Sequence, residues 1–144
     1  MAIETIRISK AGRDQLLTLK RRTKIATWNV LCRWAFCVSI RERTTPHALA
    51  GETDGAIEIS LGTLFGAHVG VYVALLRMRC KQDGLPLTDD NLNAQLRLHV
   101  HRGISYLAGA KDLASIRDLC ASAIPSSGIA GASKSKRAAR AAVA

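Results

Sequence analysis

Histidine and cysteine are the residues of this sequence that would be expected to hold a metal ion or attack a substrate. His99 and His101 flank one valine, and side chains two positions apart on a helix point about 200° from each other, so they cannot share a metal. We expect one ring to pack or hydrogen-bond inside the protein and the other to face solvent. Cys32 and Cys37 are five positions apart, hence on different helix faces, and no CxxC pair occurs. The spacing predicts no metal site and no catalytic thiol.

Other catalytic patterns are equally weak. Asp89 and Asp90 follow Thr88 at the start of a helical pattern, where acids favour the positive end of the helix dipole. There is no GxSxG nucleophile motif and no glycine-rich GK[ST] phosphate loop. Aromatic residues make up 4% of the chain, too few for a stacking platform for single strands. We therefore predict that the chain is not an enzyme and needs no cofactor, and its cysteine usage predicts a reducing cytoplasm.

Positive charge is the strongest chemical signal. The net charge is +10, and residues 1–45 hold ten Lys or Arg against three Asp or Glu, whereas residues 46–120 hold seven against eight. Such an excess at one end favours a polyanionic partner, either nucleic acid or an anionic membrane, although a run of charge can also be a solvated face. The predicted phosphate-binding residues are Arg7, Lys10, Arg13, Lys20, Arg21, Arg22 and Lys24.

The elements that carry these cations are a short strand and a helix. Ile6 and Ile8 alternate with polar residues, which is typical of a strand, and Ser9 can cap a helix from Lys10 to about Arg22. The core positions of this helix are predicted to be Leu16, Leu17 and Leu19. A two- or three-residue strand is possible at Ile57 and Ile59.

A second helix, from Trp28 to about Ile40 after a cap at Thr27, is apolar on all sides. Such a helix must be covered on several faces, and in so small a chain we expect another copy to supply part of the cover. The predicted interface residues of this helix are Trp28, Leu31, Trp34 and Val38.

Residues 59–76 contain no formal charge and reach the length of a membrane span. We predict instead one long helix from Leu61 or Thr63 to Lys81, buried on most sides in a soluble assembly, and we keep a membrane-associated protein as an alternative. Gly66 and Gly70 form a GxxxG spacing that would let another helix approach closely, so both join the predicted interface.

The remaining pattern predicts a helix that starts after a cap at Thr88 and a last helix from Asp112 to about Ala123. The first of these carries its inward positions at Leu92, Leu96, Val100, Ile104 and Leu107, with a bend at Gly103. Residues 124–144 are basic, low in complexity and expected to be disordered. The predicted fold is mainly α: a compact, homo-oligomeric helical domain over residues 1–123 with a short N-terminal strand.

A strand followed by two helices is also the outline of a ribbon-helix-helix DNA binder, in which two chains pair their strands in the major groove. That module would account for only a third of this chain. A repressor of this type is the alternative function.

Two stretches resemble signature regions of the DndE family, the small subunit of the bacterial DNA phosphorothioation (sulfur-modification) system. They are RRTKIATWNVLCRWA at residues 21–35 and HVHRGISYL at residues 99–107, and Leu75-Leu76-Arg77 fits between them; the likeness covers roughly residues 5–115. It implies a non-catalytic DNA binder, a mostly helical homotetramer that prefers nicked duplex DNA. It also implies partner subunits: a cysteine desulfurase, a reductase-like or ATP-pyrophosphatase subunit and an ATPase, which together replace a non-bridging phosphate oxygen by sulfur. No membrane is expected as a partner.

Overall fold

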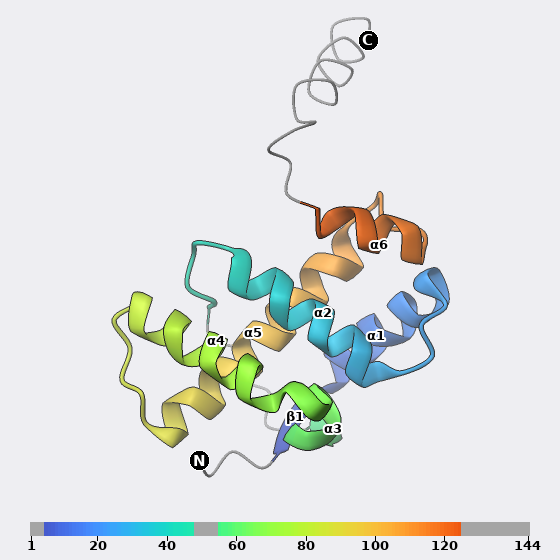
Figure 1. The fold of residues 1–144 in the computed structure, drawn as a ribbon. Helices are drawn as coiled ribbons and strands as arrows, with labels where there is room; N and C mark the ends of the chain where they lie inside the picture. The colour runs from blue at the N-terminus through green and yellow to red at the C-terminus, as the bar shows by residue number, and fades with distance from the viewer. Residues whose placement is uncertain (1–4, 48–54, 125–144) are drawn as a thin grey trace, which may run out of the picture.

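The computed structural model describes residues 5–47 and 55–124 (Figure 1). The chain is mostly helical, with a two-stranded sheet beside its N-terminus, which confirms the predicted fold class apart from the assembly. In chain order the elements are β1 (Thr5–Ser9), α1 (Lys10–Thr23), α2 (Trp28–Arg41), β2 (Gly55–Ser60), α3 (Leu61–Phe65), the 3₁₀ turn η1 (Gly66–His68), α4 (Val69–Gln82), α5 (Asp89–Gly109) and α6 (Ile116–Ser122).

The sheet pairs two strands of the same chain. β1 runs antiparallel to β2, with Ile6 opposite Ile59 and Ile8 opposite Ile57. Ile6, Ile8 and Ile59 are buried, so the alternation of the sequence decides which strand face meets the core. In a ribbon-helix-helix protein the first strand pairs with its copy in a second chain. Here β2 already pairs with β1, which argues against that alternative.

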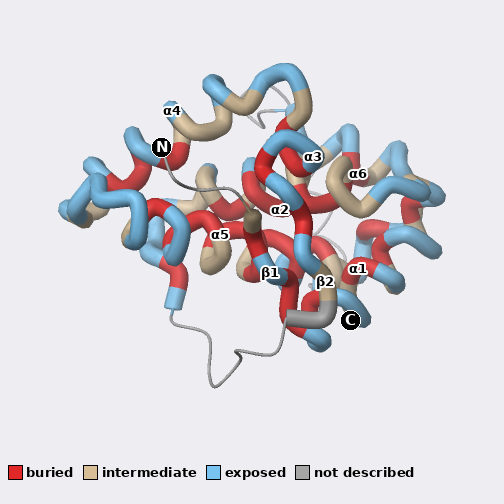
Figure 2. Tube along the Cα trace, turned by 90° about the horizontal axis from the view of Figure 1, so that it is seen from below, coloured by how far each residue is buried: buried red, intermediate tan, exposed pale blue. Residues whose placement is uncertain are grey.

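The core is built around α2 and α5, which are the most deeply buried helices (Figure 2). All five predicted inward positions of α5, from Leu92 to Leu107, are buried. Gly103 lies within this helix, which continues without a break to Gly109. Its role is contact: a Cβ on Gly103 would lie 1.7 Å from the carbonyl oxygen of Ala35, so α2 and α5 approach closely only because Gly103 has no side chain.

The predicted start of α1 is confirmed, and one of its predicted core residues is wrong. The Ser9 hydroxyl accepts a hydrogen bond from the Gly12 N–H, which caps the helix. Leu16 and Leu19 are fully buried, but Leu17 is 43% exposed. Each residue turns the helix by about 100°, so Leu17 lies well away from the stripe that Leu16, Leu19 and Thr23 share.

The long helix predicted between residues 61 and 81 is interrupted. Gly66 has φ +60°, a left-handed backbone that ends α3, and a 3₁₀ turn leads into α4. Gly66 and Gly70 therefore do not lie along one continuous helix, and the GxxxG prediction is wrong in that respect. The last predicted helix is also shorter, since the chain turns before α6 begins at Ile116. Of the expected tail, residues 125–144 lie outside the described part of the chain.

Candidate nucleic-acid interface

Exposed cations lie at both ends of α1, on its outer face. The buried residues of this helix are Gly12, Leu16, Leu19 and Thr23, and the exposed cations lie on the opposite side. We call these cations the α1 stripe, which consists of Lys10, Arg13, Lys20, Arg21 and Lys24. At 1.5 Å per residue the 14 residues of α1 extend over about 21 Å. Positive charge is thus present at both ends of the helix and not confined to one of them.

The α1 stripe is free of acidic partners. None of its five cations forms an ion pair with a residue in the described ranges 5–47 and 55–124. The only acid on α1 itself is Asp14, which is exposed. Because these side chains are not neutralised within the protein, their charge is available to an external anion.

Two other predicted cations differ in environment. Arg7 is exposed on the strand face opposite Ile6 and Ile8, next to the start of α1. Arg22 is half-buried, and its Nη1 donates to the carbonyl oxygen of Ala108 at 2.9 Å. That bond caps the end of α5, where helix carbonyls lack partners. Arg22 is accordingly turned toward the protein, unlike its neighbour Arg21.

Lys24 ends α1 in an unusual backbone state. Its φ is +62°, and its N–H donates to the carbonyl oxygen of Lys20. Glycine is the usual residue at such a left-handed helix end, and other residues carry a cost of about 1 kcal/mol or more there. Lys24 is the only non-glycine residue with positive φ among the described residues. The chain therefore keeps a cation at a position where glycine would be more stable.

Both candidate histidines are buried, so the prediction that one faces solvent is wrong. The Nε2 of His101 accepts the Ser9 N–H at 3.0 Å, and its Nδ1 lies 2.7 Å from the carbonyl oxygen of Arg97. His99 Nδ1 lies 2.8 Å from the Ser39 hydroxyl. Burial, with the positive charge of Arg102 and Arg79, lowers the pKa of His99 to about 4. Both rings join elements far apart in sequence, which spacing alone does not reveal.

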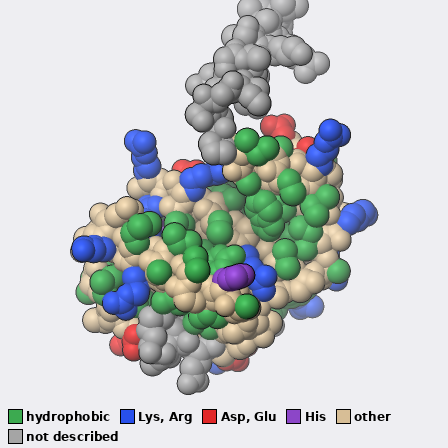
Figure 3. Space-filling view, in the orientation of Figure 1, with side chains coloured by type: hydrophobic (Ala, Val, Ile, Leu, Met, Phe, Trp, Pro, Cys, Tyr) green, Lys and Arg blue, Asp and Glu red, His purple; other side chains and the backbone are tan. Residues whose placement is uncertain are grey.

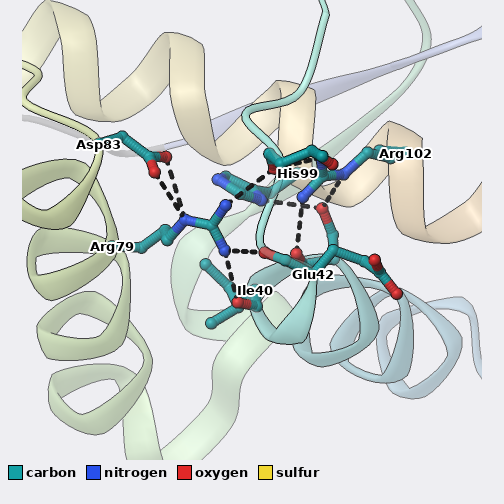
Figure 4. A network of polar contacts seen from close by, with 8 residues as sticks. Ile40, Glu42, Arg79, Asp83, His99 and Arg102 are labelled. Carbon is teal, nitrogen blue, oxygen red and sulfur yellow. Dashed lines mark hydrogen bonds and ion pairs between the residues drawn. The ribbon is translucent and has the colours of Figure 1, made fainter.

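Two arginines that no sequence motif singles out hold the end of α2 (Figure 4). Arg79 of α4 pairs with Asp83 and also donates to the carbonyl oxygens of Ile40, Glu42 and Thr44. Arg102 of α5 donates to the Ser39 hydroxyl, to the Ser39 carbonyl oxygen and to Thr44. We call this set the arginine network. It supplies donors to backbone carbonyls after the last turn of α2 and so fixes the path of residues 39–44.

Two of the four cysteines, Cys37 and Cys120, are exposed, and the other two, Cys32 and Cys80, are buried. Burial raises the pKa of the Cys32 thiol to about 12, so it stays protonated at neutral pH. Within the residues that the structure describes, no three His, Cys, Asp or Glu side chains lie close enough together to hold a metal ion.

Apolar side chains gather on one face of the molecule, over α2 and α4, with cations around its edge (Figure 3). Val71 is 59% exposed and Met78 is 48% exposed on the outer side of α4. Next to them Val30, Arg33, Trp34, Cys37 and Tyr72 line a shallow groove of about 300 Å³.

The residues predicted for an interface are divided between this face and the core. Trp28, Trp34 and Val38 are half-buried, and Gly70 is exposed with open space around it. Leu31 is fully buried in the core of its own chain, so it is not available to a second copy. Gly66 is half-buried beneath the Arg33 guanidinium, which also donates to the carbonyl oxygens of Leu64 and Thr63.

The segment Leu61–Gln82 is long and apolar enough to cross a membrane by length and composition, with a mean hydropathy of 1.4. Only 17% of its apolar window is buried, which differs from the prediction of a helix covered on most sides. Its inner face nevertheless belongs to the core, since Leu64, Phe65, Leu76 and Cys80 are buried. Length and hydropathy alone are weak support for membrane insertion, because a helix of a folded soluble domain can have the same length and hydropathy.

Comparison with known families identifies the family of this chain. The family model described as "DNA sulphur modification protein DndE" matches residues 5–115. The chain belongs to the DndE family. No curated protein matches it. Among solved structures, it is similar to DndE from Escherichia coli B7A, described as involved in DNA phosphorothioation modification. The two share 27% identity at a TM-score of 0.59, over 74% of this chain and 99% of that one.

A second DndE structure, a variant with two glycine-to-lysine substitutions, shares 24% identity at a TM-score of 0.57 and shows the same fold. The match over residues 5–115 covers every element from β1 to α5 and stops before α6. The α1 stripe, the arginine network and the apolar face of α2 and α4 all lie within the matched residues. This membership, with the β1–β2 pairing inside one chain, leaves no support for the repressor alternative.

Proposed function

We propose that this DndE-family chain is a non-catalytic DNA-binding subunit of the phosphorothioation machinery, which acts in the cytoplasm and holds duplex DNA on the basic surface of a homotetramer. The observation that carries the proposal is the α1 stripe, with five exposed cations along one helix face and no ion pair to a described acid. The proposed preference for nicked duplex DNA rests on the family resemblance.

The chemistry of the stripe suits a phosphate backbone. Lysine and arginine side chains on a straight helix can reach successive phosphates without reading the bases. Each contact releases counterions from the DNA, so the affinity should fall steeply as salt rises. Arg7, at the exposed face of β1, extends the α1 stripe beyond the N-terminal end of α1.

Assembly is supported by the apolar face of α2 and α4. Val71 and Met78 are large, exposed apolar side chains, and a contiguous patch of such residues commonly marks an interface. A second copy that covers this patch would leave the α1 stripe exposed, because α1 and α4 lie on different sides of α2 (Figure 1). Several stripes in one particle would then bind one DNA molecule with avidity.

The proposal gives the chain a binding role and leaves the sulfur chemistry to other subunits. Its one strongly perturbed thiol, Cys32, is buried with a raised pKa, the opposite of what a sulfur-transferring cysteine requires. The histidines hold structure together, because His101 binds the Ser9 N–H and His99 contacts Ser39. Partner subunits would supply the activated sulfur and the energy for the reaction.

A gel-shift panel tests this function. Purified protein is titrated against intact duplex, nicked duplex and single-stranded DNA of one sequence at two salt concentrations, with the particle mass measured by light scattering. We expect tight binding of duplex, tightest when nicked, strong weakening at high salt and a mass of four chains. A monomer that binds none of the three DNAs at low salt would contradict the proposal, and a single sequence-specific footprint would favour the repressor alternative.

A further inference from the structure

A second group of exposed cations lies at the other end of α2 from the α1 stripe. Arg77 and Lys81 are exposed on the last turns of α4, and Arg43 is exposed just after α2. We call these three residues the α4-end surface. In Figure 1 the ends of α2 and α4 lie side by side at the left of the molecule, and α1 lies at the right.

The arginine network places the segment of Arg43 against the last turns of α4, whereas Arg77 and Lys81 are on the side of that helix that faces away from Arg79. Arg79, between Arg77 and Lys81 in sequence, donates to the carbonyl oxygens of Glu42 and Thr44, which flank Arg43. Arg102 holds the same segment from α5 through Ser39 and Thr44. The backbone of Arg43 is therefore fixed against the last turns of α4.

One acid of this region, Asp83, is turned inward. It pairs with the buried Arg79, with their nitrogen and oxygen 3.0 Å apart. Burial lowers the pKa of Arg102, while Tyr106, Glu42 and Asp83 oppose that shift. Arg43, Arg77 and Lys81 form no ion pair with any described residue. The outer surface keeps only positive charge from these residues.

A favourable interaction with the helix dipole explains the position of only some of these cations. Cations in the last turn of a helix favour its negative end, and this applies to Lys81. It does not apply to Arg43, which follows α2 outside any helix. Arg77 and Lys81 are four residues apart, about 6 Å along the axis. One DNA strand carries a phosphate about every 3.4 Å along the duplex axis, so two long cationic side chains at this spacing can contact neighbouring phosphates.

We propose that the α4-end surface is a second phosphate-contacting surface, so that each protomer grips duplex DNA at both ends of α2. This inference rests on the proposed DNA-binding function and adds a site to it. Arg77 and Lys81 flank Met78, the last exposed large apolar residue of α4, so an interface between copies over the apolar face would border these two cations. The second surface lengthens the DNA path on each protomer.

The test is the salt dependence of binding to a nicked duplex. In the variant Arg43→Gln, Arg77→Gln, Lys81→Gln we expect an affinity about tenfold weaker, and a slope of log K against log salt smaller by about 0.9 for each lost phosphate contact. The matched control, Arg77→Lys with Lys81→Arg, keeps both charges and should bind like the wild type. The pair Arg77→Gln, Lys81→Gln repeats the test with Arg43 intact. Thermal unfolding and particle mass should match the wild type throughout.

The outcomes separate this inference from the proposed function. One outcome would overturn the second surface alone. In it, charge reversal of Lys20, Arg21 and Lys24 abolishes DNA binding, whereas the triple glutamine variant keeps the affinity and the salt slope of the wild type. If the triple glutamine variant binds DNA like the wild type but no longer binds a partner subunit, the α4-end surface is a protein-binding surface. That result would also overturn the inference. A wild-type protein that binds no duplex would overturn both proposals.

Discussion

Arg79 shows how one residue can reconcile charge with burial. It lies in the apolar stretch of α4 and is only 4% exposed, yet its guanidinium meets the Asp83 carboxylate and three backbone carbonyls. An arginine can donate five hydrogen bonds in a planar fork, which suits such a cluster of acceptors. Arg79 and Arg102 thus bind backbone carbonyls, whereas Arg13, Arg21, Arg43 and Arg77 are exposed and form no ion pair with a described residue.

Replacing Arg79 should be costly. In Arg79→Met, Asp83 loses its partner and the carbonyls of residues 40–44 lose their donor, so we expect the free energy of unfolding to fall by about 3 kcal/mol or more. The control is Arg77→Met on the exposed side of the same helix, which should change it by about 0.5 kcal/mol at most. Urea unfolding measures both. Equal stability of the two variants would show that the arginine network does not hold the fold.

His99 should make stability depend on pH. Its pKa in the folded protein, about 4, lies below its ordinary value of 6.5, so the unfolded chain binds the proton more readily. The stabilisation is complete above about pH 6.5 and is lost as pH falls toward 4, by up to about 1.4 kcal/mol per pH unit. His99→Gln should flatten the dependence measured by urea unfolding between about pH 7 and pH 5. The exposed control His68→Gln should keep it; a wild-type slope in His99→Gln would refute the assignment.

Substitutions of Lys24 should change the stability of the protein and its affinity for DNA in different ways. Lys24→Gly relieves the left-handed backbone, and part of the gain is offset by the greater freedom of glycine in the unfolded chain, so we expect about 0.5 kcal/mol of added stability. Lys24→Ala removes the same charge without relieving the backbone and should be no more stable than wild type. Both variants should bind DNA more weakly by a similar factor. Thermal unfolding and fluorescence anisotropy give the two readouts, and wild-type affinity in both variants would remove Lys24 from the interface.

At the scale of elements, periodicity and capping predicted most of the fold. The inward residues of α5 and the Ser9 and Thr88 caps are found where the sequence placed them. Local signals failed where the backbone changes state, as at Gly66, whose positive φ ends α3 inside an apolar run. They also failed at Leu17, where three leucines in four positions cannot share one helix face.

The contacts that organise the candidate site are mostly long-range, and no local pattern predicts them. His101 binds a backbone N–H 92 positions away, and Arg22 binds a carbonyl 86 positions away. The cations of the α1 stripe were predictable because exposure on a helix follows from its period. The division of Arg21 and Arg22 between solvent and protein depends on where α5 ends. No signal in the sequence singles out Arg79, because it stands between Arg77 and Lys81 in the charged last turns of α4.

The contact between α2 and α5 should be intolerant of a single methyl group. In Gly103→Ala the new Cβ would meet the Ala35 backbone at 1.7 Å, so the helices must separate, at a cost of about 3 kcal/mol. Gly109→Ala at the end of the same helix has nothing within 4 Å and should be neutral or slightly stabilising. Thermal unfolding of the two variants makes the comparison. Equal melting temperatures would show that α2 and α5 do not pack this closely.

On the scale of the whole molecule, charge and apolar surface are separated. The exposed apolar side chains of α4, with the groove beside Trp34, form one face. The α1 stripe and the α4-end surface lie at opposite ends of α2, outside that face. This arrangement would let copies associate through one surface while others remain open to DNA. The net charge predicted a polyanion as partner, whereas only the folded chain shows how the cations are distributed.

The most direct test of the central claim is the affinity of the variant Lys20→Glu, Arg21→Glu, Lys24→Glu for nicked duplex, measured by fluorescence anisotropy at low salt. Arg22 stays unchanged because it caps α5. Particle mass and melting temperature are measured on the same sample to show that fold and assembly persist. We predict that binding falls by at least about a hundredfold, as expected when several phosphate contacts are lost and replaced by repulsion. An intact variant that binds nicked duplex as tightly as the wild type would contradict the account.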